Sequence, residues 1–416
     1  MYGLIGKNLS HSFSKEIHQS FGNKDYELVS IDNIENFIKN SKLDGFNVTI
    51  PYKSEIVKFI DELDPISLQT NSVNTVVVRD NKLYGYNTDY YGFIETLKYH
   101  NINIENKDVI ILGNGSVSNT VVLALESLKV RNIVRLCRNT KSDIDDFFYH
   151  YKKYVDYQII INTTPVGMFP KNEDDLLFEL NDFSKLELAF DLVYNPLRTR
   201  FLLAAEKLNI KAINGLYMLV MQAKRAHELF LNCDIPLNVS NKVYKKLARK
   251  LFNIVFVGLP LSGKSKYSKL LESMLNKKLY DTDVEIENVI NMSIYDFFQN
   301  HSEAEFRMFE REIVKLVYKK HNYIISTGGG TVKVWQNIEQ LKQNGIVIYL
   351  NKDPLKIAEK KIRGRPLIKK NEDILMLAEE RIPLYKKACD ILIDINKDTV
   401  YHINEIKEKI DAYLNR

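Results

Sequence analysis

The sequence predicts an α/β chain that contains more than one parallel sheet. Two apolar, β-branched runs, 108–112 and 252–257, each lead into a glycine turn and then into a helical pattern. Strand, glycine turn and helix in that order are typical of parallel sheets whose helices cover both faces. Further short apolar runs recur along the chain, so we expect strands and helices to alternate from end to end.

Length and composition describe an ordinary globular protein. A chain of 416 residues is long enough for roughly three compact units of ~150 residues. Hydrophobic residues make up 45% and charged residues 27%, and a net charge of +5 is too small to indicate nucleic-acid binding. The three cysteines show no metal-ligand spacing, and no apolar run approaches the ~20 residues of a membrane span. Because a first strand begins at Tyr2, we expect no targeting segment and a cytoplasmic location.

Residues 1–100 place polar side chains where strands end. The first strand, 2–5, is followed by Ser12 and Ser14 and then by a helical pattern. Serines before a helix are common N-caps, and two hydroxyls spaced by two residues can also face a polyol ligand. A later strand places Lys53 beyond its carboxyl end, where the sites of α/β proteins form, although a single lysine there is often only solvated.

The first glycine turn predicts a dinucleotide site. Gly113-Asn114-Gly115-Ser116 joins the strand 108–112 to a helix, and a second strand, 132–136, follows at the expected distance. A fold that prefers NAD tends to place Asp or Glu after this second strand, whereas this chain has Arg138 and Thr140. Because a cation beside a hydroxyl favours a 2′-phosphate, we expect NADP(H) as the cofactor.

The second glycine turn has the P-loop pattern Gly258-x-x-x-x-Gly263-Lys264-Ser265. In such a loop the backbone N–H groups and the helix N-terminus face phosphate oxygens. Lys264 can reach the β- and γ-phosphates of ATP, and Ser265 can ligate Mg²⁺. The alternative, a glycine-rich turn without function, does not explain why strand, loop and helix occur together. The pattern therefore predicts that a second enzyme begins in mid-chain.

Four motifs in the first half carry a resemblance to a known family. H-S-x-S, N-V-T-I-P-Y-K, V-N-T and N-T-D occur in the order and with the spacing of the shikimate dehydrogenase family, which this half resembles. The resemblance implies that Ser12 and Ser14 bind the substrate carboxylate and that Asn74 and Asp89 bind ring hydroxyls. It also implies that Lys53, coupled to Asp89, donates the proton when a ring ketone is reduced, a role that a positioned lysine–aspartate pair can fill.

The same resemblance assigns further binding residues outside these motifs. Thr49 and Gln222 are implied as substrate contacts, although Gln222 could also be an ordinary helix-surface residue. The implied cofactor contacts are Gly113, Asn114, Gly115, Ser116, Arg138, Thr140, Tyr194 and Gly215. Ser116 departs from the glycine turn of the family, and Cys137 departs from its Asn-Arg-Thr motif.

Six motifs after Leu251 resemble those of shikimate kinase: the P-loop, D-x-D, E-x-E-F-R, G-G-G, R-P-L and R-x-P-L-Y. By this resemblance Asp283 orients or deprotonates the attacking hydroxyl, while Arg307 and Arg381 clamp the shikimate carboxylate. Taken singly, each arginine would more often be part of a surface ion pair. The other implied contacts are Asp281 on Mg²⁺ through water, Gly328, Gly329 and Gly330 along the ring, Arg365 on the γ-phosphate and Arg363 over the adenine. Leu261 stands where related kinases commonly have a glycine.

These patterns predict a substrate domain plus a Rossmann-like NADP domain, followed by a P-loop α/β domain of the nucleoside-monophosphate-kinase type. The predicted limits are 1–100 for the substrate-binding domain, completed by helices from 215–250, then 101–214 for the NADP domain and 251–416 for the kinase domain. The two predicted catalytic sets do not interleave, so we expect that a cut near Arg249 gives two separately active fragments.

The predicted activities are consecutive steps of chorismate and aromatic amino acid biosynthesis. NADPH would reduce 3-dehydroshikimate to shikimate, and ATP with Mg²⁺ would then phosphorylate the 3-hydroxyl. One alternative is a quinate/shikimate dehydrogenase fused to a kinase, and another is a shikimate-sensing regulatory protein with inactive domains. The presence of Lys53, Asp89, Lys264 and Asp283 argues against a sensor, which needs binding but no proton donor. The expected partners are these small molecules, without nucleic acid or membrane, and the pattern leaves the oligomeric state open.

Overall fold

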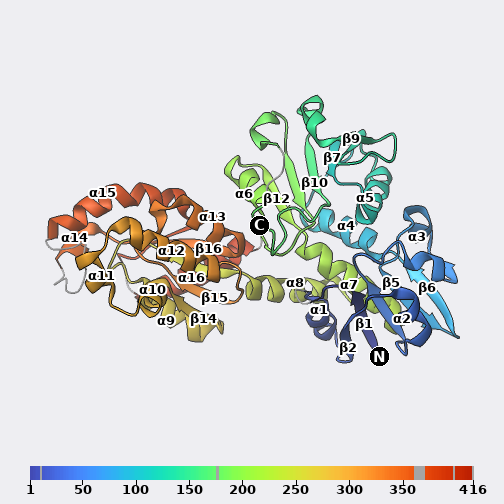
Figure 1. Cartoon of the computed structure of the whole chain (residues 1–416), viewed down its shortest axis with the longest axis horizontal. Coiled ribbons are helices and arrows are strands. Elements are labelled where there is room, and N and C mark those ends of the chain that lie inside the picture. The colour runs from blue at the N-terminus through green and yellow to red at the C-terminus, as the bar shows by residue number, and fades with distance from the viewer. Residues whose placement is uncertain (10–11, 175–177, 360–370, 397–398, 415–416) are drawn as a thin grey trace. The chain divides into compact units, whose positions relative to one another are not determined.

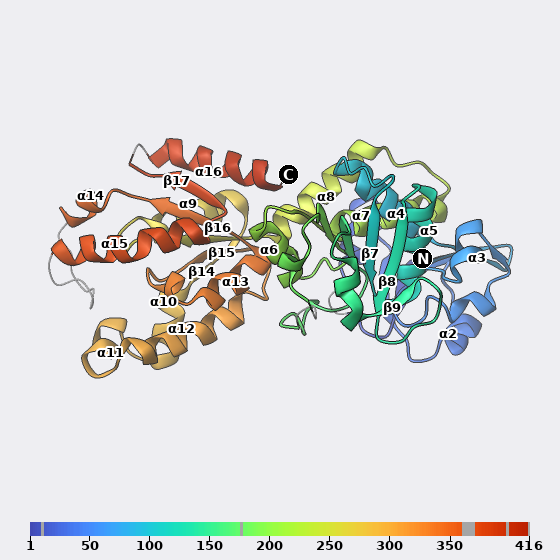
Figure 2. The ribbon, with the colours of Figure 1, turned by 90° about the horizontal axis from the view of Figure 1, so that it is seen from above.

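The computed structural model describes residues 1–9, 12–174, 178–359, 371–396 and 399–414. The chain divides into two compact units. The first consists of Met1–Tyr194 and Ala204–Lys246, and the second of Asn195–Leu203 and Leu247–Arg416. Strands and helices alternate within both units (Figures 1 and 2), as the sequence predicted for an α/β chain.

The first unit begins with a six-stranded sheet in the order β2-β1-β3-β5-β6-β4. β1 pairs parallel with β2 and β3, whereas β5 pairs antiparallel with β3 and β6. Successive side chains of β1 point to opposite faces, so that Leu4 packs with Tyr26 and Phe230 while Ile5 packs with Phe46. The strands are β1 (Tyr2–Gly6), β2 (Tyr26–Ser30), β3 (Gly45–Val48), β4 (Glu62–Leu63), β5 (Thr75–Arg79) and β6 (Lys82–Tyr86), and the helices are α1 (Ser14–Ser20), α2 (Ile34–Asn40), η1 (Ile56–Phe59) and α3 (Pro65–Thr70).

A second six-stranded sheet in the same unit is parallel throughout, in the order β12-β11-β10-β7-β8-β9. This is the doubly wound order of a dinucleotide-binding fold. Strands are added outward from β7 on one side and from β10 on the other, so the strand order reverses between β7 and β10. The strands are β7 (Asp108–Leu112), β8 (Asn132–Cys137), β9 (Asp145–Phe147), β10 (Ile159–Asn162), β11 (Leu188–Asp191) and β12 (Lys211–Asn214). The helices are α4 (Thr88–Tyr99), α5 (Ser116–Ser127), η2 (Phe148–Tyr154), η3 (Leu180–Asp182) and α7 (Leu216–Leu231), while α6 (Arg200–Lys207) and α8 (Leu237–Leu251) each have residues in both units.

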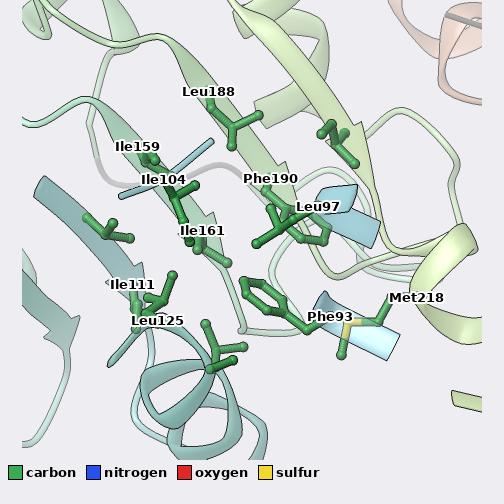
Figure 3. Close-up of a cluster of buried hydrophobic side chains, with 14 residues drawn as sticks. Phe93, Leu97, Ile104, Ile111, Leu125, Ile159, Ile161, Leu188, Phe190 and Met218 are labelled. Atoms are coloured by element: carbon green, nitrogen blue, oxygen red, sulfur yellow. The ribbon is translucent and has the colours of Figure 1, made fainter. Parts of the chain in front are cut away.

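The core of this second sheet explains why its strands read as continuous apolar runs. All residues of β7, β10 and β11 are buried, because helices cover both faces of a parallel sheet. Figure 3 shows the cluster, in which Phe93 of α4 stacks on Phe190 of β11 with ring centroids 5.4 Å apart. Leu125 of α5 and Met218 of α7 complete it from other helices. The helix that carries Asp89 is therefore held against the dinucleotide-type sheet.

The second unit contains a five-stranded parallel sheet in the order β14-β15-β13-β16-β17. The first strand of the unit, β13, is central, so the loop that follows it leaves from the middle of the sheet. The strands are β13 (Asn253–Val257), β14 (Lys278–Asp281), β15 (Tyr323–Ser326), β16 (Gly345–Asn351) and β17 (Ile391–Asp394). The helices are α9 (Lys264–Leu275), α10 (Thr282–Ile290), α11 (Ile294–Asn300), α12 (Glu303–Val317), η4 (Thr331–Lys333), α13 (Trp335–Asn344), α14 (Pro354–Ala358), α15 (Asn371–Ala388) and α16 (Thr399–Leu414).

Asn195–Leu203 is part of the second unit, although the residues on both sides of it in the sequence belong to the first. The backbone N–H of Arg198 donates to Gln343 O at 2.9 Å, and that of Leu197 donates to Asn344 Oδ1 at 3.0 Å. The guanidinium of Arg198 lies 3.2 and 3.0 Å from the two carboxylate oxygens of Asp390, and these side chains are only 5% and 7% exposed. The sequence placed this segment in the range 101–214; the predicted domain limits stay predictions.

The α/β class and its strand–turn–helix units are as predicted. The predicted strands 2–5, 108–112, 132–136 and 252–257 correspond to β1, β7, β8 and β13. Among the described residues, none of the helices is both long enough and apolar enough to span a membrane.

Candidate active sites

Lys53 and Asp89 come together from two different elements. Lys53 follows β3, its carbonyl accepting from Val73 N at 2.8 Å, and Asp89 lies in the first turn of α4. Lys53 Nζ donates to Asp89 Oδ2 at 2.5 Å, with side chains 12% and 10% exposed. Acidic residues are favoured in the first turn of a helix, which suits Asp89 to this position. The structure therefore contains the lysine–aspartate pair that the sequence predicted.

Asn74 and Gln222 are joined through Thr88, the residue before Asp89. Asn74 Oδ1 accepts from Thr88 N at 2.8 Å and from Thr88 Oγ1 at 3.1 Å. Gln222 of α7 lies 3.5 Å from the same hydroxyl and donates to Leu219 O at 2.9 Å. Among the described residues Asn74 Nδ2 has no hydrogen-bond partner, so this amide N–H group is available to an acceptor on a ligand. Two of the predicted substrate contacts therefore adjoin the Lys53–Asp89 pair.

The predicted serine pair forms a separate group at the start of α1. Ser12 Oγ donates to Ser14 Oγ at 3.1 Å, and Ser14 N donates to Ser12 Oγ at 3.2 Å. The ring of Phe13, between them, lies 5.8 Å from that of Tyr194, which is the predicted cofactor contact. Thr49 N donates to Ile5 O at 3.0 Å, which fixes Thr49 at the end of the strand that leads to the serines. Among the residues that the structure describes, the two hydroxyls contact only this turn, so they are placed to meet a ligand as well.

A hydrogen bond from the following helix holds the first glycine turn. Gly113 has φ +96°, and its carbonyl accepts from Ser118 Oγ at 2.9 Å. Gly115 is the residue before α5, so the N–H groups of Ser116 and the residues after it lie at a helix N-terminus, which favours phosphate. Asn114 Nδ2 donates to Asn139 O at 2.6 Å, which ties this turn to the loop after β8.

The loop after β8 presents the predicted 2′-phosphate contacts to solvent. Arg138 and Thr140 are exposed, and among the described residues Arg138 makes no ion pair. Cys137, which replaces the family's asparagine, is buried, and burial raises the pKa of its thiol. Gly215 begins α7 and its N–H donates to Val193 O at 3.1 Å, so it supports the loop that carries Tyr194. Burial raises the pKa of Tyr194, whose hydroxyl therefore stays protonated.

The lysine of the P-loop donates hydrogen bonds to backbone carbonyls of the same loop. Lys264 Nζ donates to Gly258 O at 2.8 Å and to Leu259 O at 3.0 Å, and the side chain is buried. Gly263 immediately precedes α9 with φ +97°, and Leu261 also adopts a left-handed conformation, with φ +64°. Leucine is disfavoured at positive φ, which is a physical reason for the glycine that related kinases commonly have there.

Ser265 and Asp281 form a pair suited to a hard cation. Ser265 Oγ donates to Asp281 Oδ2 at 3.3 Å, and Asp281 Oδ1 accepts from Asp283 N at 3.1 Å. Mg²⁺ is commonly held by one or two protein oxygens, with waters and substrate phosphates completing the octahedron. A hydroxyl and a carboxylate beside the P-loop fit that requirement. Among the described residues, no group of three or more His, Cys, Asp or Glu side chains could hold a metal ion.

Asp283 and Arg307 each approach one of the three glycines that follow β15. A Cβ on Gly328 would lie 2.6 Å from Asp283 Oδ1, and a Cβ on Gly330 would collide with the guanidinium of Arg307. Only residues without a side chain allow this approach. Gly329 lies against Pro260 of the P-loop, and its carbonyl accepts from the hydroxyl of Tyr385. Burial raises the pKa of Tyr385, so this hydroxyl remains a donor.

Carboxylates hold the two predicted shikimate-binding arginines in place. Arg307 donates to Glu303 and Glu310, both at 2.9 Å, and Arg381 Nε donates to Glu380 at 3.2 Å. Lys333 bridges Glu303 and Glu380 at 3.1 and 2.9 Å. Burial alone would lower the pKa of Arg307, but Glu310 and Glu303 outweigh burial and raise it. Arg307 therefore remains charged, and both arginines lie in one connected network of ion pairs.

Sequence reasoning missed several members of these sites. Thr88 lies inside N-T-D, and Glu303 lies inside E-x-E-F-R, so both were visible but received no role. Glu310, fully buried, follows Arg307 by three residues, the spacing at which helix side chains are neighbours. Tyr385 gave no signal beyond its place in R-x-P-L-Y, and Lys333 lies in none of the motifs. The predicted contacts Arg363 and Arg365 lie outside the described residues, so their roles remain predictions.

Two family models match the chain. Residues 4–76 match the shikimate dehydrogenase substrate binding domain, and residues 260–411 match shikimate kinase. The first match covers β1 to β5 with Ser12, Lys53 and Asn74, and the second extends from the P-loop into α16.

Relatives extend the first match over the whole dehydrogenase-like half. A shikimate dehydrogenase (NADP(+)) of Clostridium perfringens is 36% identical over 269 residues, which cover 59% of this chain and 98% of that protein. The crystal structure of a chorismate mutase/shikimate 5-dehydrogenase fusion protein from Clostridium acetobutylicum is similar with a TM-score of 0.55 and 31% identity, covering 59% of this chain and 96% of that one.

A shikimate dehydrogenase solved in complex with NADP⁺ gives a TM-score of 0.52 at 29% identity, covering 59% of this chain and 94% of that chain. These relatives span most of their own length on the first half, while the shikimate kinase match begins where that half ends. The chain therefore belongs to the shikimate dehydrogenase family and carries a shikimate kinase domain after it.

Proposed function

We propose that this chain reduces 3-dehydroshikimate to shikimate with NADPH and then phosphorylates shikimate with ATP and Mg²⁺. The Lys53–Asp89 pair beside Asn74 is the observation that carries the proposal, because ketone reduction needs a proton donor next to groups that bind a polyol. The relatives support the cofactor, since the Clostridium perfringens protein is a shikimate dehydrogenase (NADP(+)). The shikimate kinase match over residues 260–411 supports the second step.

In the reduction, Lys53 donates a proton to the carbonyl oxygen as it becomes an alcohol. Asp89 holds the ammonium group by the 2.5 Å hydrogen bond and accepts from a ring hydroxyl with its remaining lone pairs. Asn74 Nδ2 donates to a second ring oxygen, and Ser12 and Ser14 bind the carboxylate. NADPH, when bound, supplies the hydride.

The residues of the first unit fit NADPH. The turn at Gly113 and the N-terminus of α5 provide N–H groups for a pyrophosphate, and Arg138 supplies an exposed cation for a 2′-phosphate. The loops that carry Tyr194 and Gly215 follow β11 and β12, at the carboxyl edge of the same sheet. Ligands of such sheets bind at this edge.

In the phosphorylation, Asp283 orients the attacking hydroxyl and accepts its proton, while Arg307 and Arg381 hold the shikimate carboxylate. Gly328 and Gly330, which have no side chains, leave the space that Asp283 and Arg307 occupy. Lys264 leaves its loop carbonyls for the β- and γ-phosphates, and Arg365 stabilises the transferring group. Ser265 and Asp281 would hold Mg²⁺, directly and through water, and the metal would offset the phosphate charge.

A coupled assay on the full chain tests the proposal. With 3-dehydroshikimate, NADPH and MgATP we expect shikimate 3-phosphate, with loss of one equivalent of NADPH and of ATP for each product. Omitting NADPH should leave no product, and omitting ATP should stop the reaction at shikimate. Binding of shikimate without turnover of either cofactor would contradict the proposal and support a sensor. A higher kcat/KM for quinate oxidation than for shikimate oxidation would support the quinate alternative.

A further inference from the structure

Asp145 occupies an unexpected position beside the predicted 2′-phosphate loop. It lies in β9, ten residues after Arg135 of β8, and its side chain is 0% exposed. Arg135 Nε donates to Asp145 Oδ1 at 2.6 Å. Lys141 N and Asn114 Nδ2 donate to Oδ2 at 2.7 and 3.1 Å. A buried carboxylate thus connects the first glycine turn, two neighbouring strands and the loop between them.

The guanidinium of Arg135 extends the same network. Its Nη1 donates to Asn119 Oδ1 of α5 at 2.7 Å, and its Nη2 donates to Ser142 Oγ at 2.7 Å. Ser142 Oγ in turn donates to Asp145 Oδ1 at 3.1 Å. Asn114, which also donates to Asp145, binds the carbonyl of Asn139 at 2.6 Å. The backbone of residues 138–142 is therefore fixed at Asn139, between Arg138 and Thr140, and again at Lys141.

Asp145 does not have the role of the acidic residue that binds a ribose in NAD-preferring folds. Both of its carboxylate oxygens are occupied by protein donors, and its side chain has no exposed surface. Burial alone would raise the pKa of Asp145, but hydrogen bonds from Asn114, the Lys141 N–H and Arg135 outweigh it and lower the pKa. The carboxylate is therefore ionised and paired with Arg135, so it adds little net repulsion toward a nearby phosphate.

We propose that Asp145 is a positioning residue that sets the preference for NADPH over NADH. It acts by holding residues 138–142 so that Arg138 and Thr140 can meet a 2′-phosphate. The inference rests on the proposed dehydrogenase function. NADH has no 2′-phosphate, so releasing the loop should weaken NADPH use and leave NADH use nearly unchanged.

The test compares Asp145→Asn with Arg138→Ala in the full chain. We expect Asp145→Asn to lower kcat/KM for NADPH about 10- to 100-fold, mainly through KM, with the NADH value changed less than about threefold. Arg138→Ala should lose the same preference. The control is Asp108→Asn, which removes another ion-paired carboxylate of the same sheet, the partner of Arg131, and should leave the NADPH/NADH ratio unchanged.

A binding measurement separates this inference from the proposed function. Wild-type protein should bind 2′,5′-ADP more tightly than 5′-AMP in calorimetry, and Asp145→Asn should remove most of that difference. If the wild type shows the difference but reduces no 3-dehydroshikimate, the proposed function fails while the inference holds. Ser142→Ala, which removes the hydroxyl that accepts from Arg135 and donates to Asp145, serves if Asp145→Asn does not fold. Equal losses for both nucleotides, or an unchanged ratio in either variant, would overturn the inference.

Discussion

The two candidate sites differ in what their cations contact before any ligand binds. In the first unit Lys53 already donates to Asp89, its partner in the proposed reduction. In the second unit Lys264 donates to two carbonyls of its own loop, and Arg307 donates to Glu303 and Glu310. The dehydrogenase-like pair is thus assembled in advance, whereas the kinase-like lysine must exchange its protein acceptors for phosphate oxygens.

The difference follows from what each cation has to do. A proton donor has to be held at one place with its charge balanced, and an Asp–Lys hydrogen bond does both. A phosphate-binding lysine has to exchange protein acceptors for phosphate oxygens when the nucleotide arrives. The loop carbonyls that accept from Lys264 carry no net charge, so phosphate oxygens can replace them at a lower electrostatic cost than they could replace a carboxylate. We therefore expect the activity of the first site to fall when one side chain of the pair is removed. We expect the activity of the second site to fall when the spacing between its backbone and its charged side chains changes.

The largest effect should come from the preassembled pair. Lys53→Ala removes the proton donor, and loss of a general acid typically costs ~10²–10⁴ in rate. Reduction of 3-dehydroshikimate should fall by that factor while phosphorylation of shikimate by the same purified chain is unchanged. Lys58→Ala, which changes an exposed lysine that pairs with Glu55 at 3.9 Å, is the control. Reduction by Lys53→Ala at nearly the wild-type rate would remove Lys53 from the mechanism.

The second effect concerns the stability of the second unit. Arg198 is almost fully buried against Asp390, and removing one partner of a buried ion pair costs about 3–5 kcal/mol. Arg198→Met should therefore lower the thermal transition that shikimate and ATP stabilise, by about 6 °C or more. Arg249→Met, which breaks the exposed pair with Asp411 in the same unit, should shift it by less than about 2 °C. Equal shifts in the two variants would mean that Arg198 contributes no more than a surface ion pair.

This contact also changes the expectation for a cut near Arg249. A fragment that begins there lacks Asn195–Leu203, which leaves Asp390 with Lys342 at 2.9 Å as its remaining cation. We now expect such a fragment to phosphorylate shikimate poorly and to recover when the 195–203 segment is supplied. Full activity of the fragment alone would restore the original expectation of two independent halves.

A change of spacing should have the third effect. Gly330→Ala introduces a Cβ that collides with the Arg307 guanidinium, and a displacement of about 1 Å in a site can cost roughly 10²-fold. The loss should appear in kcat/KM for shikimate, with the KM for ATP nearly unchanged. Reduction of 3-dehydroshikimate by the same chain provides an internal control. A variant with normal shikimate kinetics would show that Arg307 does not need its observed position.

The sequence predicted those features that depend on local patterns. Buried strands such as β7 and β13 read as apolar runs, and the residues at their ends could be named from motifs because parallel sheets place sites at one edge. The Arg198–Asp390 pair could not be predicted, since the partners lie 192 positions apart and each looks like an ordinary surface residue. Asp145 was equally hidden, because its function depends on four donors from different elements. Contacts between residues that are distant in the sequence produce no periodic pattern in it.

The smallest effect should be a pH dependence confined to the first unit. His18 of α1 is buried, stacks on Tyr26 with ring centroids 4.0 Å apart, and faces His227 of α7 at 5.9 Å. Neither ring nitrogen of His18 has a hydrogen-bond partner among the described residues. Burial, with a smaller contribution from His227, lowers the pKa of His18 from 6.5 to about 3.

A histidine whose pKa is lower in the folded protein than in the unfolded chain must be neutral to fold. Above pH 6.5 His18 is neutral in both the folded and the unfolded chain, so it does not change the free energy of unfolding. As the pH falls from 6.5 toward 3, the unfolded chain binds the proton first, and the free energy of unfolding decreases. At pH 5 this loss amounts to about 2 kcal/mol. We expect His18→Phe, which keeps an aromatic ring against Tyr26, to flatten the fall in unfolding free energy of the first unit between pH 7 and pH 5. His301→Phe, at an exposed position in the second unit, should leave that fall unchanged. An equally steep fall in the His18→Phe protein would assign the acid sensitivity to other groups, with His227 the first to test.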